Sequence, residues 1–151
     1  MEFTVLKIIT IILAFTLVLM APQAYSRDTK HMMSIQEALA SPNFKAKLDP
    51  SISLYFGDQT HPKVERTIGT YPTNKKTNAF NKTDEEACQW VFLSTLIALT
   101  ERAKKEGGDA VINIVSYYKK DTFSSNTEFE CHAGSFVSGV ALSGEVVKLA
   151  K

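Results

Sequence analysis

Two cysteines and three histidines are the side chains of this sequence best suited to chemistry. They are Cys88, Cys131, His31, His61 and His132. The cysteines can form a disulfide or bind zinc as thiolates, and Cys88 can act as a reactive thiol near a helix N-terminus. Consecutive strand residues point to opposite faces, so Cys131 and His132 cannot readily bind one ion. We therefore predict no metal or cofactor. His132 with acids such as Glu130 is a weak metal candidate, and its alternative role is an exposed strand residue.

The N-terminus indicates export, which changes how the cysteines are interpreted. An almost unbroken apolar run from Ile8 to Met20 follows a short leader with one lysine, and Ala24 and Ser26 fit the small residues before a cleavage site. The run is shorter than the roughly 20 residues of a membrane span. We predict a signal peptide over residues 1–26 and a periplasmic or secreted product that does not contact the membrane after cleavage. An uncleaved anchor is the alternative.

An oxidising compartment favours a disulfide between Cys88 and Cys131. Closing a loop of this length would stabilise the fold by about 4 kcal/mol. The reactive thiol and the zinc site remain the alternatives to this disulfide.

Nucleotide, nucleic-acid and hydrolase functions lack the residues they need. No GxxxxGK phosphate loop occurs, and the net charge of +1 gives no basic footprint for nucleic acid. Ser135, Ser138 and Ser143 follow His132 closely, but no GxSxG motif surrounds any of them. We therefore predict that the protein is not an enzyme, with an enzyme of unrecognised type as the alternative.

The best candidate for a recognition surface is an aromatic and basic stretch after a predicted strand. It comprises Tyr117, Tyr118, Lys119, Lys120 and Phe123. Exposed aromatic and basic side chains are typical of contacts with partners, so we predict an envelope protein or a glycan as the ligand here. The alternative is that the tyrosines are ordinary sheet residues with solvated lysines beside them.

One helix, predicted over Thr83 to Gly108, must position these residues. Thr83 and Glu86 form a capping box at its start, and Gly107 or Gly108 can end it in the left-handed conformation. The apolar stripe between the caps includes Cys88 and Trp90 and is too wide for an isolated surface helix. The strands that follow are expected to cover it.

The strand pattern predicts an α+β fold for a single domain over residues 27–151. Strands are expected at 51–56, 63–70, 109–120, 127–132 and 135–149, with the first two forming a hairpin, 71–82 an exposed loop and 27–33 loosely held. Two short helices, over 34–39 and 41–48, precede them. The prediction is an antiparallel sheet of about four to five strands packed on one long helix. Cys131 shares a strand face with Phe129, so both should face the helix.

Three segments resemble a family of small exported proteobacterial proteins of unknown function. They are KTNAFNKTDEEAC, DEEACQW and VINIVSYYKKDTFSSNTEFECHAGSFVSGVAL. Members are sometimes labelled as an excinuclease ATPase subunit, a label that the missing nucleotide motifs contradict. The chain is more distantly similar to the YbjQ-like family and to the outer-membrane stress-sensor lipoprotein of the Rcs phosphorelay. This similarity implies the fold and one disulfide, with Cys88 and Cys131 at matching positions, whereas the sensor's second disulfide and lipid-bearing cysteine have no counterpart.

Together these observations predict a non-enzymatic, exported, disulfide-bonded binding or envelope-associated module. The first alternative is a metal-binding protein that uses His132 and nearby acids. The second is an enzyme of unrecognised type.

Overall fold

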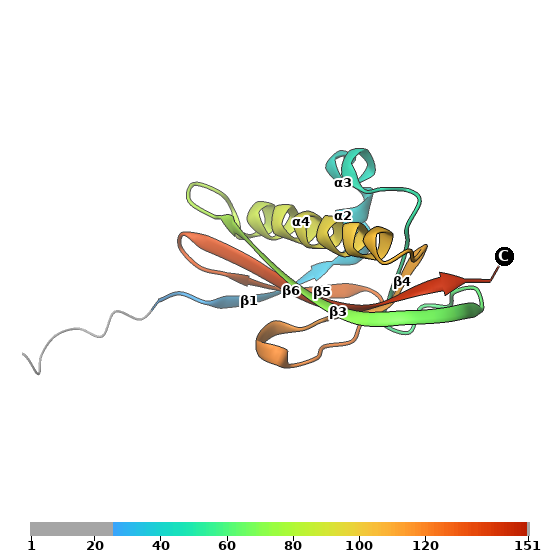
Figure 1. The fold of residues 1–151 in the computed structure, drawn as a ribbon. Helices are drawn as coiled ribbons and strands as arrows, with labels where there is room; N and C mark the ends of the chain where they lie inside the picture. Colours follow the sequence, from blue (N-terminus) through green and yellow to red (C-terminus); the bar gives the residue numbers. More distant parts are fainter. Residues whose placement is uncertain (1–25, 151) are drawn as a thin grey trace, which may run out of the picture.

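A computed structural model describes residues 26–150, which form a curled six-stranded sheet with helices on one face (Figure 1). The elements in chain order are β1 (Thr29–Ser34), α2 (Ile35–Ala40), α3 (Pro42–Lys47), β2 (Ser53–Phe56), β3 (Val64–Asn78), α4 (Asp84–Lys105), β4 (Ala110–Ser116), the 3-10 turn η1 (Tyr118–Lys120), β5 (Glu128–Ala133) and β6 (Val137–Leu149). Apart from Ser26, the predicted signal peptide lies outside the described residues. Within residues 26–150, no helix has the length and apolar character needed to cross a membrane.

The strand β6 is the centre of the sheet. β3 pairs with it along its whole length on one side, and the other side is divided between two shorter strands. β5 pairs at Ser138 and Gly139, and β4 pairs further along, up to Val147. Gly144 permits the close approach of β4, because a Cβ added there would lie 2.5 Å from Cγ1 of Val111. β1 extends the sheet from β5, and β2 extends it from β4.

The sheet differs from the sequence-based expectation in three ways. It has six strands, rather than four or five, and β2 pairs with β4 in parallel, so the sheet is mixed. The expected hairpin between 51–56 and 63–70 is wrong, because β3 pairs with β6 instead. The segments 71–82 and 27–33, predicted as loop and loosely held chain, contribute much of β3 and β1. Both are strands that pair on one side only, where backbone hydrogen bonds are enough and apolar alternation is not required.

The helix α4 begins and ends as the capping residues predict. Thr83 Oγ1 accepts a hydrogen bond of 3.1 Å from the Glu86 amide. Gly107 takes a left-handed φ of +79°, and the Gly108 amide donates to the Ala103 carbonyl. One member of the expected apolar stripe differs: Trp90 is 42% exposed, and Lys47 Nζ lies 4.3 Å above its ring.

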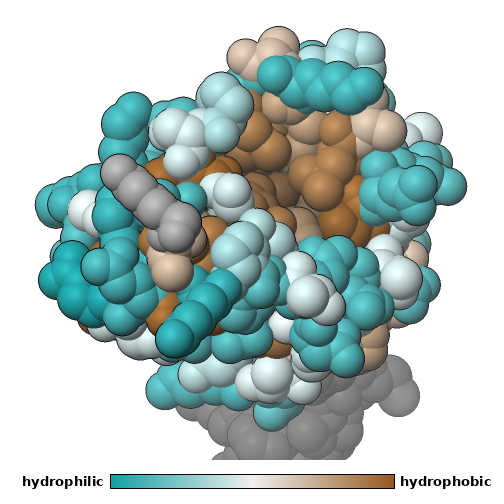
Figure 2. Space-filling model, turned by 90° about the vertical axis from the view of Figure 1, so that its right-hand side faces the viewer, coloured by the Kyte–Doolittle hydropathy of each residue, from teal (hydrophilic) through white to brown (hydrophobic). Residues whose placement is uncertain are grey.

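Phe92 of α4 is the centre of an aromatic core. Its ring stacks on Phe129 of β5, with 3.7 Å between ring centroids, and it also contacts Phe44 of α3 and Phe56 of β2. These contacts bring three separate elements onto one turn of the helix. Figure 2 shows the end of the molecule near the C-terminus, where apolar side chains gather in a hollow bordered by hydrophilic residues.

The disulfide joins Cys88 to Cys131, one helical turn from Phe92 and two strand residues from Phe129. Both cysteines are fully buried. The predicted pairing and the predicted strand face are both confirmed.

Replacing both cysteines by alanine should lower the free energy of unfolding by about 4 kcal/mol, because the bond closes a loop with a sequence separation of 43. Urea denaturation of wild type and Cys88→Ala/Cys131→Ala measures the difference. The reduced wild type is the control and should unfold at nearly the same urea concentration as the variant. A loss of under about 1 kcal/mol would show that the disulfide adds little to the stability of this fold.

Candidate functional site

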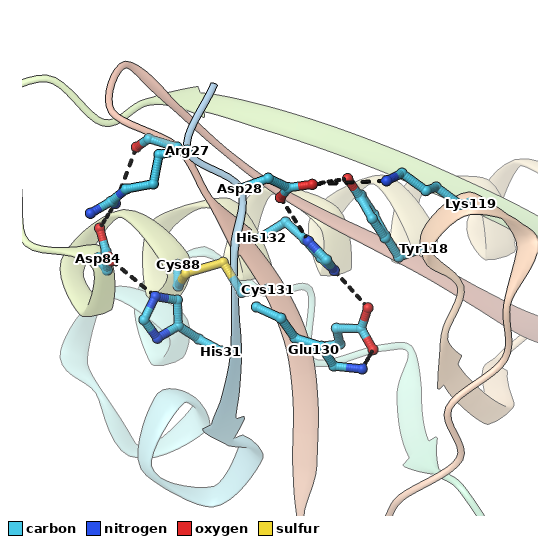
Figure 3. Close-up of polar contacts among 12 residues, drawn as sticks. Arg27, Asp28, His31, Asp84, Cys88, Tyr118, Lys119, Glu130, Cys131 and His132 are labelled. Atoms are coloured by element: carbon cyan, nitrogen blue, oxygen red, sulfur yellow. Dashed lines mark hydrogen bonds and ion pairs between the residues drawn. A yellow bond between two sulfur atoms is a disulfide. The ribbon is translucent and has the colours of Figure 1, made fainter. Parts of the chain in front are cut away.

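The candidate site lies on the face of β5 that points away from α4. Phe129 and Cys131 face the helix, so Glu130 and His132 point to the opposite side of the sheet. β1 runs antiparallel beside β5 and places Lys30 opposite His132. Polar side chains of β1, β5 and the turn η1 therefore meet on the outer face (Figure 3).

We call the group formed by Asp28, Lys30, Tyr118, Glu130 and His132 the His132 cluster. His132 lies between two carboxylates: its Nδ1 is 2.8 Å from Asp28 Oδ1, and its Nε2 is 2.7 Å from Glu130 Oε1. The Tyr118 ring stacks on the imidazole with 3.4 Å between ring centroids, and its hydroxyl donates to Asp28 Oδ2. Both ring nitrogens of His132 are thus within hydrogen-bond distance of a carboxylate.

Glu130 is the most buried charged group of the cluster, at 8% exposed. Lys30 Nζ lies 2.6 Å from its Oε2, and its backbone amide donates to Ser116 Oγ. Burial raises the pKa of Glu130, but the hydrogen bonds from Lys30 and His132 outweigh burial and hold this pKa below its ordinary value of 4.5. The carboxylate is therefore ionised and fully paired at neutral pH.

The other two acidic groups of the cluster have opposite pKa shifts. The hydrogen bond from His132 lowers the pKa of Asp28 below its ordinary value of 3.8, and the bond from Tyr118 adds to this effect. Burial raises the pKa of Tyr118 above 10.0, and its hydrogen bond to Asp28 raises it further. At neutral pH the phenol thus keeps its proton and donates a hydrogen bond to the ionised carboxylate of Asp28.

A second polar group lies on the helix side of β1, next to the disulfide. The Arg27 guanidinium donates to Asp84 at the start of α4, and His31 Nε2 lies 2.9 Å from the other oxygen of Asp84. The Arg27 hydrogen bond is the main cause of the lowered pKa of Asp84. These contacts fasten β1 to the helix and fix the position of Asp28, the next residue in the chain.

A pocket of about 890 Å³ opens beside the His132 cluster. One wall carries Arg27, Asp28, Tyr118 and His132, and the rest of the lining comes from β3, the β5–β6 turn and the start of β6, where Gly139 pairs with His132. The residues of this remaining lining are Lys76, Gly134, Ser135, Phe136, Val137 and Gly139. The pocket thus offers cations, a carboxylate, hydroxyls and aromatic rings, and this mixture suits binding of a polar ligand with an apolar face.

His132 is poorly placed to act as a general base toward Ser135 or as a metal ligand. Both ring nitrogens of His132 are bound to carboxylates, so neither is free to activate Ser135 or to bind a cation. Among residues 26–150, no group of three or more potential ligands is placed to hold a metal. Cys131 is in the disulfide on the opposite face of β5.

The structure brings only part of the predicted recognition surface to the pocket. Tyr118 belongs to the His132 cluster, and Lys119 Nζ lies 3.9 Å from Asp28. Tyr117 is half-buried and bonds to the backbone of β6, Lys120 is exposed, and Phe123 forms a bridge to Ser116. His132 itself is not an exposed strand residue, because its side chain is only 13% exposed.

Sequence reasoning missed Asp28 and Arg27. Both lie in the stretch read as loosely held, and their partners are distant in the chain: Asp28 and His132 are 104 positions apart. The sequence contains one signal for this strand. Asp28 and Lys30 occupy alternate positions with Thr29 and His31, so in a strand Asp28 and Lys30 lie on the same face.

Comparisons with known proteins identify no relative of this chain, so the geometry of the site is the basis for assigning its function. No protein-family model, curated protein or solved structure matches the chain. The fold and the site together define a disulfide-bonded α+β domain with a polar pocket on the outer face of its sheet.

Replacing Lys30 by methionine should lower the free energy of unfolding by about 1 kcal/mol at neutral pH, because Glu130 loses a charged hydrogen-bond donor that is half exposed to solvent. The pKa of Glu130 is lowered in the folded protein, so its stabilising contribution is present above 4.5 and is lost as pH falls through the lowered pKa. Urea unfolding over this pH range should show the difference between variant and wild type shrinking in acid.

The matched control is Lys119→Met, which removes a lysine that is 71% exposed and 3.9 Å from its carboxylate partner. This change should cost less than about 0.5 kcal/mol. Equal losses for the two variants, or a Lys30→Met loss that does not depend on pH, would contradict the role assigned to the Lys30–Glu130 pair.

Proposed function

We propose that this protein is an exported, non-enzymatic binding module whose pocket beside the His132 cluster holds a glycan of the cell envelope. The observation that carries the proposal is the pocket of about 890 Å³ with one wall fixed by charged hydrogen bonds. Its size lies at the upper end of the range for small-ligand sites, roughly 300 to 1,000 Å³. A few sugar units fill such a volume, whereas a protein partner usually needs a broader surface.

The pocket lining favours a sugar. Sugar rings have an apolar face and a rim of hydroxyls, and the lining provides Phe136 for the face and Arg27, Asp28 and Ser135 for the hydroxyls. The side chains of the His132 cluster are hydrogen-bonded to one another, so they are already oriented before a ligand arrives. Preorganisation of this kind lowers the entropic cost of binding.

Export is supported by two independent features. The sequence begins with the pattern of a signal peptide over residues 1–26. The fully buried Cys88–Cys131 disulfide is of the kind found in oxidising compartments. We therefore place the mature protein in the periplasm or outside the cell.

Intact-mass analysis of the protein recovered from the envelope or the medium tests this placement. The expected mass is that of residues 27–151 less two hydrogens, for cleavage after Ser26 and one disulfide. Reduction should add the two hydrogens back. A product that retains residues 1–26, or that has two free thiols, contradicts the proposed processing and compartment.

Glycan binding is tested by titrating the 15N-labelled mature domain with soluble peptidoglycan fragments. Amide shifts should concentrate at Gly134, Ser135 and Gly139, which line the pocket. Tyr118→Leu should weaken binding at least about tenfold, equivalent to about 1.4 kcal/mol, because it removes the ring and hydroxyl that hold His132 and Asp28 in place beside the pocket.

Tyr117→Leu is the matched control, since Tyr117 is the neighbouring tyrosine and does not line the pocket. Its affinity should remain within about twofold of wild type. Absence of shifts, or shifts centred away from the pocket, rules out glycan binding at this site. The metal-binding alternative is tested by calorimetric titration with zinc and copper. It requires that the wild type release or absorb heat on binding the metal and that His132→Gln abolish this heat.

A further inference from the structure

Two loops meet at one end of the molecule and expose a pair of stacked aromatic rings. Phe80, between β3 and α4, and Phe136, in the β5–β6 turn, lie with 6.0 Å between ring centroids. Their exposed fractions are 57% and 66%, and Val137 beside them is 49% exposed. We call Phe80, Phe136 and Val137 the aromatic tip. Adjacent exposed apolar side chains of this kind make the tip a candidate surface for contact with another molecule.

The aromatic tip is held in place by the backbone. The Ala79 amide donates to the Phe136 carbonyl at 2.9 Å, which ties the two loops together. The Phe80 amide donates to Asn78 Oδ1, and Val137 pairs with Asn78 at the end of β3. The rings are therefore displayed on a braced surface, and their exposure is a property of the fold.

The tip lies at the end of the molecule where the described chain begins. In Figure 1 the β3–α4 loop, the β5–β6 turn and the start of β1 project at the same end, opposite the C-terminus. Arg27 confirms the proximity, because its guanidinium donates to the Gly134 carbonyl at 3.3 Å.

Lysines accompany the aromatic tip. Lys76 and Phe136 line the same shallow hollow, and Lys82 lies in the β3–α4 loop with its Nζ bonded to the Asn78 carbonyl. Asp84, which follows this loop, is neutralised by Arg27. Glu85 and Glu86 come next on α4, so the attraction to anionic headgroups is moderate and the aromatic rings supply the larger part of binding.

We propose that the aromatic tip docks the exported domain onto an anionic lipid membrane, with Phe80 and Phe136 entering the interface and Lys76 and Lys82 facing the headgroups. Aromatic and basic residues on one surface are the combination that binds membrane interfaces. This inference does not depend on the glycan pocket. Docking would nevertheless place the pocket near the membrane, since Phe136 and Val137 line both sites.

Vesicle cosedimentation tests the proposal on the mature chain, residues 27–151, which contains every described helix and strand. Wild type should bind phosphatidylglycerol vesicles at least about tenfold more tightly than phosphatidylcholine vesicles, and high salt should weaken this binding. Phe80→Ser/Phe136→Ser should reduce binding to phosphatidylglycerol at least about tenfold. Lys76→Gln/Lys82→Gln should remove most of the preference for the anionic lipid.

The matched controls are Trp90→Ser, which removes an exposed aromatic residue outside the tip, and Lys45→Gln/Lys105→Gln, which removes two exposed lysines elsewhere. Both should bind vesicles as wild type does. Urea midpoints verify that every variant is folded. Phe80→Ser should retain glycan binding, because Phe80 does not line the pocket, and Tyr118→Leu should retain vesicle binding, so the two proposals fail separately.

Three results would overturn membrane docking. Wild type could show no preference for phosphatidylglycerol vesicles, or Phe80→Ser/Phe136→Ser could bind them as tightly as wild type. Sedimentation velocity without vesicles could instead reveal a dimer that Phe80→Ser/Phe136→Ser dissociates, in which case a second copy of the chain occupies the tip.

Discussion

The two-residue period of β5 beneath α4 is the constraint on which the rest of the structure depends. Cys131 bonds to Cys88, and Phe129 stacks on Phe92, so two alternate residues of β5 are fixed to the helix. A shift of β5 by one residue would break both contacts and would point the His132 side chain into the apolar core. The disulfide therefore does more than stabilise the fold, because it also fixes which side chains reach the outer face.

The strand β1 carries this constraint from the core to the site. On the helix side, His31 and Arg27 hold Asp84, and on the outer side the adjacent residue Asp28 holds His132. Because β1 pairs with β5 in a single antiparallel register, the contacts on the helix side and those on the outer side can form only together. As a result this part of the pocket is held by contacts on both faces of the sheet although it lies at the sheet edge, and such fixed positions are what a preorganised binding site requires.

The sequence was most informative where local signals and burial agree. The caps of α4, the disulfide and the facing of Phe129 are local or periodic features, and the structure confirms all of them. β1 and most of β3 were missed because an edge strand pairs on one side and needs no apolar alternation. Asp28 was missed for a related reason: its role arises only from pairing between strands far apart in the chain.

The position of the pocket relative to the aromatic tip gives the two proposals a common geometry. The part that contains His132 is held by ion pairs and by the disulfide-bonded core, and the pocket continues to the β5–β6 turn, which exposes Phe136. That turn is itself tied to the β3–α4 loop by the hydrogen bond from the Ala79 amide to the Phe136 carbonyl. A membrane bound at the tip would therefore leave the His132 side of the pocket unchanged, and the pocket could be occupied with or without docking.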